Sequence, residues 1–519
     1  MINTNPKELI GIIDIGANSV KLNISSCPLN KKNTIIENLW MPVAIGKDIY
    51  SKKIITGEAL NDLINILIKF KETLDIYGVS EVRVIATSAL RQAKNLDAVI
   101  GRIQNEIDLK VEILEPIIEA EILFETIKNK IEKNQYYKNE NILIFAIDSS
   151  ITIIIYISKG KIIFSETQNI GTLEMLRIYE LPQKSIEIFI NYISSKMLNS
   201  LLCFDSTGYE KINKIIILND DMLDILKKSK DIHKNQILLT IDKQRFEKIT
   251  DHINKIKISH TNEILLGEIL IKSGKIAIKI FNMVCALIKT EQIIIPNINR
   301  MTALLEKMPF LKKGSFYELN VSLKDNIISA AVQLGYKYKF DYNHAMKVKE
   351  ISEKIYEFIK DYYNFKPKSG FYLQIAAILH DIGYFVNPKD HHLHSEYLIK
   401  SADILGLDNY DLKLISEIVK YHRKLDPQQN RNELSSFTPD DRVAIACLAG
   451  ILKISETLDK SHSGLVEDIK IQIKNETLKL FLKLKGNNYE HLEILRMLLK
   501  EKSDIFENFF NLQIVIDKM

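Results

Sequence analysis

Apolar and polar positions alternate in short runs over the first part of the chain, which is typical of strands joined to helices. Residues 9–26 form two such runs around a polar turn, and a third strand is expected near residues 39–45. Leucine and isoleucine then recur at helical spacing, which predicts a helix over residues 56–77. A continuous apolar run at residues 82–86 predicts a buried strand. The pattern therefore predicts a sheet that is covered by helices.

The same arrangement returns later in the chain. An apolar run at residues 142–147 ends on Asp148, and a second strand is expected at residues 151–157, just as the first run of the chain ends on Asp14. Such an internal repeat predicts two similar α/β lobes with a cleft between them. We place the two lobes at residues 1–125 and 126–305.

From residue 322 onward the apolar positions follow helical spacing almost without interruption. His344 stands at the head of one amphipathic helix, and a second helix ends on the adjacent pair His380 and Asp381. Glu456 lies in a later helical stretch, and the strand pattern returns near the end of the chain. We expect an all-α domain at residues 306–464 and a small α/β segment at residues 465–519.

The composition of the 519 residues is that of an ordinary globular protein, with 46% hydrophobic and 26% charged residues. The net charge of +4 is mild and does not argue for nucleic acid as a partner. The four cysteines form no CxxC pair, which fits a reducing compartment. The sequence shows neither a signal-peptide core near its start nor an apolar run that could span a bilayer, so we expect a cytoplasmic protein without a membrane partner.

The turn that follows Asp14 carries groups suited to phosphate. Gly16 lets the backbone approach a ligand closely, while Asn18 and Ser19 offer amide, hydroxyl and backbone donors. Asp14 is a hard oxygen ligand of the kind that holds Mg²⁺ or its waters. The alternative for this stretch alone is an ordinary hairpin with a polar turn.

A second group of candidate residues follows the strand at residues 82–86. Thr87 or Ser88 can cap the next helix, and Arg91 offers a forked donor for phosphate. The alternative here is a helix cap beside a solvated arginine. Glu119, in the first turn of a later helix, either serves the helix dipole or acts as a general base.

These motifs together resemble the Ppx/GppA phosphatase family, which comprises exopolyphosphatases and guanosine pentaphosphate phosphohydrolases. The stretch Asp14-Ile15-Gly16-Ala17-Asn18-Ser19 is similar to the family's first phosphate loop, and Ala86-Thr87-Ser88-Ala89-Leu90-Arg91 with Asn95 to its second signature. Residues 376–380 and 421–424 are similar to the exopolyphosphatase version of the second half. The resemblance covers nearly the whole chain. It implies a two-lobed actin/hexokinase/sugar-kinase-like α/β domain, followed by an all-α HD-like domain and a small C-terminal α/β segment.

The resemblance also implies a catalytic site between the lobes. The family's Gly-x-Glu-Glu-Ala stretch corresponds to residues 116–120, in which Pro116 stands at the glycine and only Glu119 of the glutamate pair is kept, so the general base is placed on Glu119. Asp14 and Asp148 would be catalytic residues that organise Mg²⁺ and the attacking water. The implied phosphate-binding residues are Gly16, Asn18, Ser19, Thr87, Ser88 and Arg91. The implied substrate is inorganic polyphosphate or guanosine pentaphosphate, and the sequence does not choose between them.

The second lobe departs from the family pattern. The family's Asp-x-Gly-Gly-Gly-Ser loop matches Asp148-Ser149-Ser150-Ile151-Thr152-Ile153, in which the aspartate is present and every glycine is gone. Gly171 is a second-lobe family glycine that can still be placed. A non-catalytic family member that binds a phosphorylated ligand or a protein partner is therefore the alternative function.

The HD-like half implies a metal set of its own. His344, His380, Asp381 and Glu456 would hold a second divalent ion for phosphoester hydrolysis. The alternatives are histidines with a structural role, or an HD-like domain that is the sole active centre. The resemblance also leaves a homodimer open, because this domain forms dimers in exopolyphosphatases.

Overall fold

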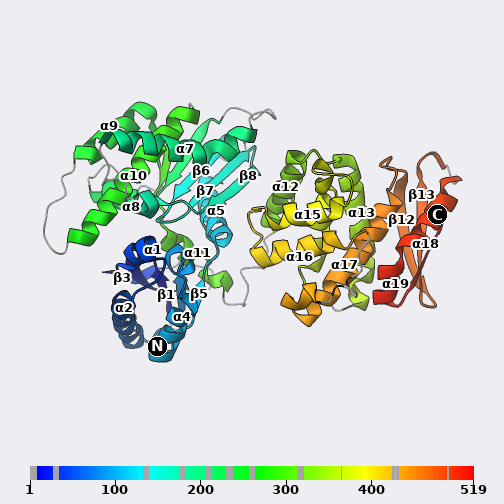
Figure 1. Cartoon of the computed structure of the whole chain (residues 1–519), viewed down its shortest axis with the longest axis horizontal. Helices are drawn as coiled ribbons and strands as arrows, with labels where there is room; N and C mark the ends of the chain where they lie inside the picture. The colour runs from blue at the N-terminus through cyan, green and yellow to red at the C-terminus, as the bar shows by residue number, and fades with distance from the viewer. Residues whose placement is uncertain are drawn as a thin grey trace, which may run out of the picture. The chain divides into compact units, whose positions relative to one another are not determined.

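In the computed structural model, the chain forms two compact units, Met1–Asn320 and Val321–Met519 (Figure 1). Within the described residues, no helix combines the length and the apolar composition needed to cross a membrane. The structure describes residues 9–26, 34–132, 139–175, 183–204, 212–228, 238–255, 264–288, 290, 292–311, 321–363, 365–423, 427, 430, 432–487 and 490–519.

The first lobe is built on a five-stranded sheet with the order β3-β2-β1-β4-β5. β1 is the central strand, antiparallel to β2 and parallel to β4. The pairing places Asp14 of β1 opposite Lys21 of β2 and Ile85 of β4, so the acid lies inside the ladder near its end. The strands are β1 (Leu9–Ile15), β2 (Ser19–Ser26), β3 (Thr34–Pro42), β4 (Glu81–Ala86) and β5 (Val111–Ile113).

The helices of the first lobe confirm one sequence prediction and correct another. The helix expected at residues 56–77 is α2, which begins after Thr56 because the Thr56 side chain accepts the backbone N–H of Ala59. The strand expected at residues 39–45 ends earlier, at Pro42, and Ile45 begins a helix instead. Proline has no N–H for the ladder, and the chain beyond it turns back toward the end of β1. The helices are α1 (Ile45–Lys52), α2 (Gly57–Ile76), α3 (Ser88–Arg91), α4 (Leu96–Ile107) and α5 (Pro116–Glu132).

The second lobe repeats the topology of the first. Its sheet has the order β10-β11-β9-β6-β7-β8, in which β6 takes the place of β1, with an antiparallel β7 on one side and a parallel β9 on the other. β10 is an extra antiparallel strand at the edge. The predicted pair of similar α/β lobes is therefore confirmed. The strands are β6 (Asn141–Ile147), β7 (Thr152–Ser158), β8 (Lys161–Gln168), β9 (Lys214–Leu218), β10 (Leu238–Asp242) and β11 (Gln292–Pro296).

The core of the second lobe lies between its sheet and its helices. All seven residues of β6 are buried, and Phe145 of this strand meets Phe281 edge to face, with ring centroids 6.1 Å apart.

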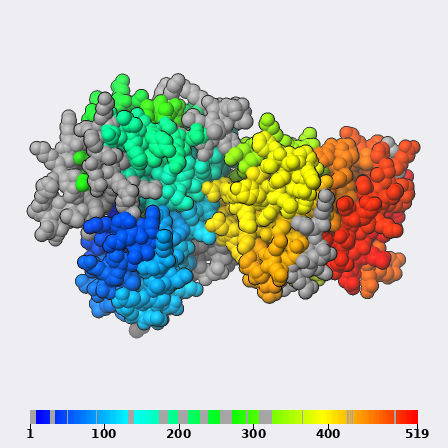
Figure 2. Space-filling model, in the orientation of Figure 1, coloured from blue at the N-terminus to red at the C-terminus, as the bar shows by residue number. Residues whose placement is uncertain are grey.

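In Figure 2 the first lobe (blue) and the second lobe (cyan to green) are in contact. The predicted lobe bounds at residues 125 and 305 fall inside α5 and α11. The helices are α6 (Thr172–Met175), α7 (Gln183–Phe204), α8 (Asp220–Lys228), α9 (Lys243–Lys255), α10 (Ile264–Ile288) and α11 (Arg300–Leu311).

The second unit begins with helices packed around α14, which contacts α12, α13, α16 and α17. α14 is apolar and buried along its described length, as expected of a central helix. The α-helices are α12 (Val321–Lys337), α13 (Tyr342–Ile359), α14 (Ser369–Leu379), α15 (His391–Lys400), α16 (Asn409–Lys420) and α17 (Pro439–Leu458). Short 3₁₀ turns are η3 (Lys360–Tyr362), η4 (Ile382–Phe385) and η5 (Glu433–Ser436).

A three-stranded sheet and two helices close the second unit. β13 is antiparallel to β12 and parallel to β14. This segment packs on α17, where a side chain at Gly450 would come within 3.1 Å of the Phe506 backbone. The elements are β12 (Val466–Lys474), β13 (Thr477–Leu484), η6 (Lys485–Asn487), α18 (Glu490–Lys502), α19 (Asp504–Phe510) and β14 (Gln513–Lys518).

Candidate functional site

Three carboxylates from both lobes converge on the guanidinium of Arg300, at the first position of α11. Nε and Nη2 of Arg300 each lie 3.1 Å from Oδ2 of Asp14. Nη1 donates to Oε1 of Glu119 over 3.3 Å and also to Oδ2 of Asp148. The structure thus brings together the three predicted catalytic carboxylates, around a cation that the sequence analysis does not identify.

The repeated topology explains this convergence. Asp14 is the next-to-last residue of β1, Asp148 comes directly after β6, and the two strands hold equivalent central positions in their sheets. Each turn is closed by a backbone hydrogen bond, from Gly16 N to Ser19 O (2.9 Å) and from Asp148 N to Ile151 O (2.8 Å). Glu119 and Arg300 lie in the first turns of α5 and α11, two helices that contact each other.

The environment of Glu119 suits proton transfer. Burial raises the pKa of this carboxyl to about 7, although Arg300 and Arg91 oppose the shift. Its Oε2 atom is buried and has no hydrogen-bond partner among the described residues. A carboxyl with a pKa near neutrality and an unused oxygen can accept a proton from a water molecule.

Other polar atoms around this site are also buried without a partner in the described part of the chain: Asp14 Oδ1, Thr87 Oγ1, Arg91 Nη2 and Ser150 Oγ. Folded proteins pair most buried polar atoms with protein or water. A small cavity of about 50 Å³ lies beside Glu119, Asp148 and Arg300, and its remaining lining consists of Asn219, Asp220 and apolar side chains. The site therefore has room for a few water molecules and keeps polar groups in reserve for them or for a ligand.

The predicted phosphate-binding residues lie around the ends of β1 and β4. A Cβ at Gly16 would come within 3.3 Å of Nη2 of Arg300, so the glycine leaves room for the guanidinium. Asn18 is buried and its carbonyl accepts Val43 N, while Ser19 begins β2.

On the β4 side, Nη1 of Arg91 donates to the Leu114 carbonyl, and its Nη2 is buried without a partner among the described residues. Thr87 follows β4 and its backbone N–H lies 3.4 Å from Ile15 O. Ser88 begins α3, and its side chain lies outside the described atoms.

The backbone conformation of the second-lobe turn does not require glycine. Ser149, Ser150 and Ile151 are all described, and none of them has a positive φ. Gly171 lies against this turn, since a Cβ there would come within 2.2 Å of the Ser150 backbone. Burial opposes ionisation of Asp148, but Arg300 and the N–H of Ser149 bring its pKa below the usual value. The turn therefore still presents an ionised Asp148 to the cleft.

Acidic residues at the start of α8 are neutralised locally. Asp220 lies 3.5 Å from Nζ of Lys21, a first-lobe lysine that the sequence analysis does not single out as a site residue. Burial raises the pKa of Asp221 to about 7, and its carboxyl accepts a hydrogen bond from Ser273. A phosphorylated ligand would therefore meet less negative charge here than two free carboxylates carry.

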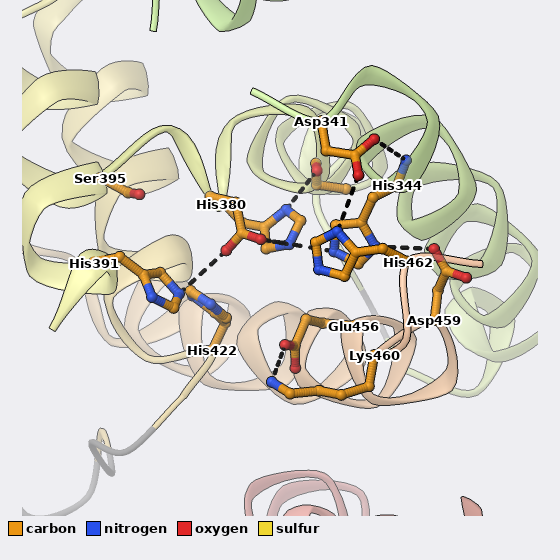
Figure 3. Close-up of polar contacts among 12 residues, drawn as sticks. Asp341, His344, His380, His391, Ser395, His422, Glu456, Asp459, Lys460 and His462 are labelled. Carbon is orange, nitrogen blue, oxygen red and sulfur yellow. Dashed lines mark hydrogen bonds and ion pairs between the residues drawn. The ribbon is translucent and has the colours of Figure 1, made fainter. Parts of the chain in front are cut away.

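The second unit contains a separate cluster of histidines (Figure 3), and the side chain of Asp381 lies among them. Oδ2 of Asp381 lies 3.7 Å from Nε2 of His344 and 3.4 Å from Nε2 of His380. Glu456, the fourth predicted ligand, instead pairs with Lys460 over 2.5 Å. Asp459 accepts Nδ1 of His344 over 2.9 Å. The structure thus brings together three of the four predicted metal ligands.

Two more histidines reach the same carboxylate. Nε2 of His391 lies 3.1 Å from Oδ1 of Asp381, and His422 lies beside it. Among the described residues, two groups of side chains are compact enough to hold an ion, with ligand atoms within 4.8 Å of one another. One group is His344, His380 and Asp381, and the other is Asp381, His391 and His422. Burial lowers the pKa of His380 and of His422. Lys424, next to this cluster in sequence, lies outside the described residues.

Comparisons with known proteins give a consistent result. The family model described as "Ppx/GppA phosphatase family" matches residues 30–268, and that described as "Ppx/GppA phosphatase, domain III" matches residues 328–503. A guanosine-5'-triphosphate,3'-diphosphate pyrophosphatase of Pseudoalteromonas translucida is 22% identical over 438 residues, 80% of this chain and 81% of that protein.

Other matches are partial. A bifunctional 3-dehydroquinate synthase/phosphatase of Fusobacterium nucleatum is 30% identical over 146 residues, which are 27% of this chain and 22% of that protein. Exopolyphosphatase 1 of Mycobacterium leprae is 25% identical over 22% of this chain and 34% of its own length. The crystal structure of an exopolyphosphatase from Cytophaga hutchinsonii superposes with a TM-score of 0.49 and 21% identity, covering 58% of this chain and 97% of that one.

Proposed function

Because this chain belongs to the Ppx/GppA phosphatase family, we propose that it hydrolyses a terminal phosphoanhydride bond, either of inorganic polyphosphate or at the 5'-phosphate of guanosine pentaphosphate. The observation that carries the proposal is the meeting of Asp14, Glu119 and Asp148 around Arg300 at the junction of two α/β lobes. Phosphoryl transfer relies mainly on positioning and on stabilisation of charge, which these groups supply.

Glu119 is the proposed general base. Its buried carboxyl has a pKa of about 7 and an Oε2 atom without a partner among the described atoms. At neutral pH a substantial fraction is ionised, so Oε2 can take the proton of a water molecule as that water attacks the terminal phosphorus. Arg300 holds the carboxylate through Oε1 and so fixes its direction.

Arg300 has a second proposed role as a cation for the phosphate. Its guanidinium is already placed between the lobes, where negative charge would accumulate on the phosphoryl oxygens. The proposed phosphate contacts are Gly16, Asn18, Ser19, Thr87, Ser88 and Arg91. Of these, Arg91 and Thr87 keep a buried polar atom free within the described chain, which supports their assignment.

Mg²⁺ is the proposed cofactor of the cleft. Asp14 keeps Oδ1 buried and unpaired among the described residues, and Asp148 is ionised, so these carboxylates fit a hard cation. The ion would neutralise phosphate charge when bound. Asp14 and Asp148 would hold it, and Arg300 would share their remaining oxygen atoms.

The alternative, a non-catalytic protein that binds a phosphorylated ligand, rests on the lost second-lobe glycines. The turn nevertheless keeps Asp148 in the cleft, on the same guanidinium as Asp14 and Glu119. A carboxyl with a pKa near 7 that shares a cation with two aspartates is typical of an active site. We therefore favour the enzyme.

In the second unit we propose a divalent ion on His344, His380 and Asp381, whose ligand atoms already lie together. Asp459 orients His344 through its Nδ1 atom. Glu456 would have to leave Lys460 to join this set as a fourth ligand.

Release of inorganic phosphate tests the proposal. Purified protein is incubated with Mg²⁺ and either long-chain polyphosphate or guanosine pentaphosphate, with Glu119→Gln as the matched inactive control. We expect the wild-type protein to release phosphate from at least one substrate and the variant to lose this activity. Tight binding of a substrate without any turnover would support the alternative instead.

A further inference from the structure

We propose that the second unit holds two divalent transition-metal ions bridged by Asp381, with His344 and His380 on one ion and His391 and His422 on the other (Figure 3). The inference rests on the proposed ion at His344 and His380 and adds a second ion to it. It does not depend on the chemistry of the cleft.

The geometry places one oxygen of Asp381 toward each pair of histidines. Oδ2 lies 3.4 Å from Nε2 of His380 and 3.7 Å from Nε2 of His344. Oδ1 lies 3.1 Å from Nε2 of His391. A carboxylate that uses its two oxygens for different ions is a usual bridge in two-metal sites, where the ions lie about 3.5–4 Å apart.

The Nδ1 atoms of the histidines, which face away from Asp381, indicate that the cluster requires a cation. Nδ1 of His344 faces the Asp459 carboxylate at 2.9 Å, and Nδ1 of His380 faces the Ala377 carbonyl at 2.8 Å. Nδ1 of His422 likewise contacts a carbonyl, that of Val419. Each acceptor requires a proton on Nδ1, so a neutral ring directs its Nε2 lone pair toward the cluster. Lone pairs that face a carboxylate repel it unless a cation, either a metal ion or a second ring proton, lies between them.

The atoms that face the centre of the cluster also support bound ions. The Nε2 atoms of His344, His380, His391 and His422, together with Oδ1 of Asp381, are buried and have no hydrogen-bond partner in the described part of the chain. The contact of His391 with Asp381 is close but lacks hydrogen-bond geometry. Buried polar atoms left unpaired on one side of a cluster indicate a ligand that completes them.

The ligand chemistry selects the metal class. Four imidazoles suit zinc, iron, nickel or copper better than Mg²⁺ or Ca²⁺, which prefer oxygen ligands throughout, and the carboxylate also suits Mn²⁺. The carbonyls of Ala377 and Val419 and the Asp459 carboxylate would then orient the imidazoles from behind. Asp381 is the most exposed of the five side chains, at 13%, so solvent reaches the cluster on its side.

Arg423 makes the two proposed ions differ in binding affinity. Its Nη1 lies 2.8 Å from Nδ1 of His391, and because arginine is always a donor this contact favours a proton on Nε2, the ligating atom. Binding of the second ion requires that proton to leave and the Nδ1 proton to face the Pro388 carbonyl, 3.2 Å away. We therefore expect the ion on His391 and His422 to bind more weakly than its neighbour.

Metal counting tests the proposal on the full chain. Metal-free protein is equilibrated with Mn²⁺ alone, separated from free ions and analysed for manganese per chain, and its electron paramagnetic resonance spectrum is recorded. The difference between wild type and Asp381→Asn counts the ions of this cluster, whatever the cleft binds. His422→Gln and His344→Gln probe the two halves, and His252→Gln, an exposed histidine of α9, is the matched control. Circular dichroism verifies that each variant is folded.

We expect a difference of two ions for Asp381→Asn, a loss of one ion for His422→Gln, no loss for His252→Gln, and the spectrum of a spin-coupled Mn²⁺ pair in the wild-type protein. Arg423→Gln should increase the affinity for the second ion about tenfold without changing the first. A difference of one ion that survives in His422→Gln would overturn the two-ion centre while the proposed site at His344 and His380 stands. A difference of zero would reject both.

Discussion

Arg300 donates two hydrogen bonds of 3.1 Å to a single oxygen of Asp14, across 286 positions of sequence. The same guanidinium contacts Asp148 of the other lobe. One side chain therefore neutralises acids from both sheets and joins the two lobes at the point where the proposed substrate would bind.

Replacement of Glu119 by glutamine tests the general base. The amide keeps the contact with Arg300 but cannot accept a proton, so we expect kcat to fall at least ~10²-fold with little change in KM. Steady-state phosphate release measures both constants. Glu121→Gln, on the same helix, is the matched control, and a larger loss there would move the base to Glu121.

Replacement of Arg300 by methionine removes the cation from the cluster of acids. The buried Asp14 would then lie near the partly exposed Asp148 with Lys21 as the remaining nearby cation, and we expect a loss of about 3 kcal/mol in the free energy of unfolding. Urea denaturation measures the loss. Mg²⁺ should recover part of it, because the ion would supply the missing positive charge. Unchanged stability with and without Mg²⁺ would contradict this account of the cluster.

The pKa of Glu119 predicts the pH dependence of catalysis. The base must be ionised, and its pKa is about 7, so kcat/KM should rise about tenfold per pH unit below pH 7 and level off above it. A pH series with a constant Mg²⁺ concentration gives the profile. An acid limb near pH 4.5, the ordinary value for glutamate, would show that the base is an exposed carboxyl.

Asp221 predicts a separate effect of pH on stability. Its folded-state pKa, about 7, lies above the ordinary value of 3.8, so its contribution to stability is complete below about pH 4 and is lost as the pH rises through 7. Asp221→Asn keeps an acceptor for Ser273 and has no charge to bury. At pH 8 the variant should be more stable than the wild type by about 1 kcal/mol or more, and at pH 4 the two should be equal. Thermal unfolding at both pH values provides the comparison.

Glycines restored to the second-lobe turn should act differently at neighbouring positions. Ser150→Gly removes a hydroxyl that is buried without a partner in the described chain, so we expect unchanged or higher phosphate release. Ile151→Gly empties a fully buried site and should cost about 2–5 kcal/mol of stability. If Ser150→Gly lowers activity at unchanged stability, the hydroxyl itself binds the substrate.

The sequence predicts the lobes because their signal is local. Strand, aspartate, turn and strand follow one another within about twenty residues, both around Asp14 and around Asp148. The helix at Ile45 is missed because Gly46 resembles a turn residue. The structure shows that Gly46 N donates to the Ala17 carbonyl over 2.7 Å, a tertiary contact that no local pattern contains.

The sequence likewise predicts some residues of the site and misses others. Carboxylates at strand ends can be recognised from their own neighbours in sequence, as Asp14 and Asp148 are. Arg300 has no local signal, since it begins a helix after an ordinary strand and meets its partners only through the packing of two lobes. The histidines at positions 391 and 422 are visible in the sequence, but only the arrangement of α15 and α16 shows that they share Asp381.

The close approach of Gly171 to the Ser150 backbone limits which substitutions this chain can accept. The turn at residues 149–151 no longer contains glycine, and the residue facing it has no room for even a methyl group. In this lobe the need for a small residue is thus kept at the position opposite the loop, while the loop itself does without one. In a saturation library selected for folded protein, Gly171 should tolerate almost no replacement, whereas Ser149 should accept many.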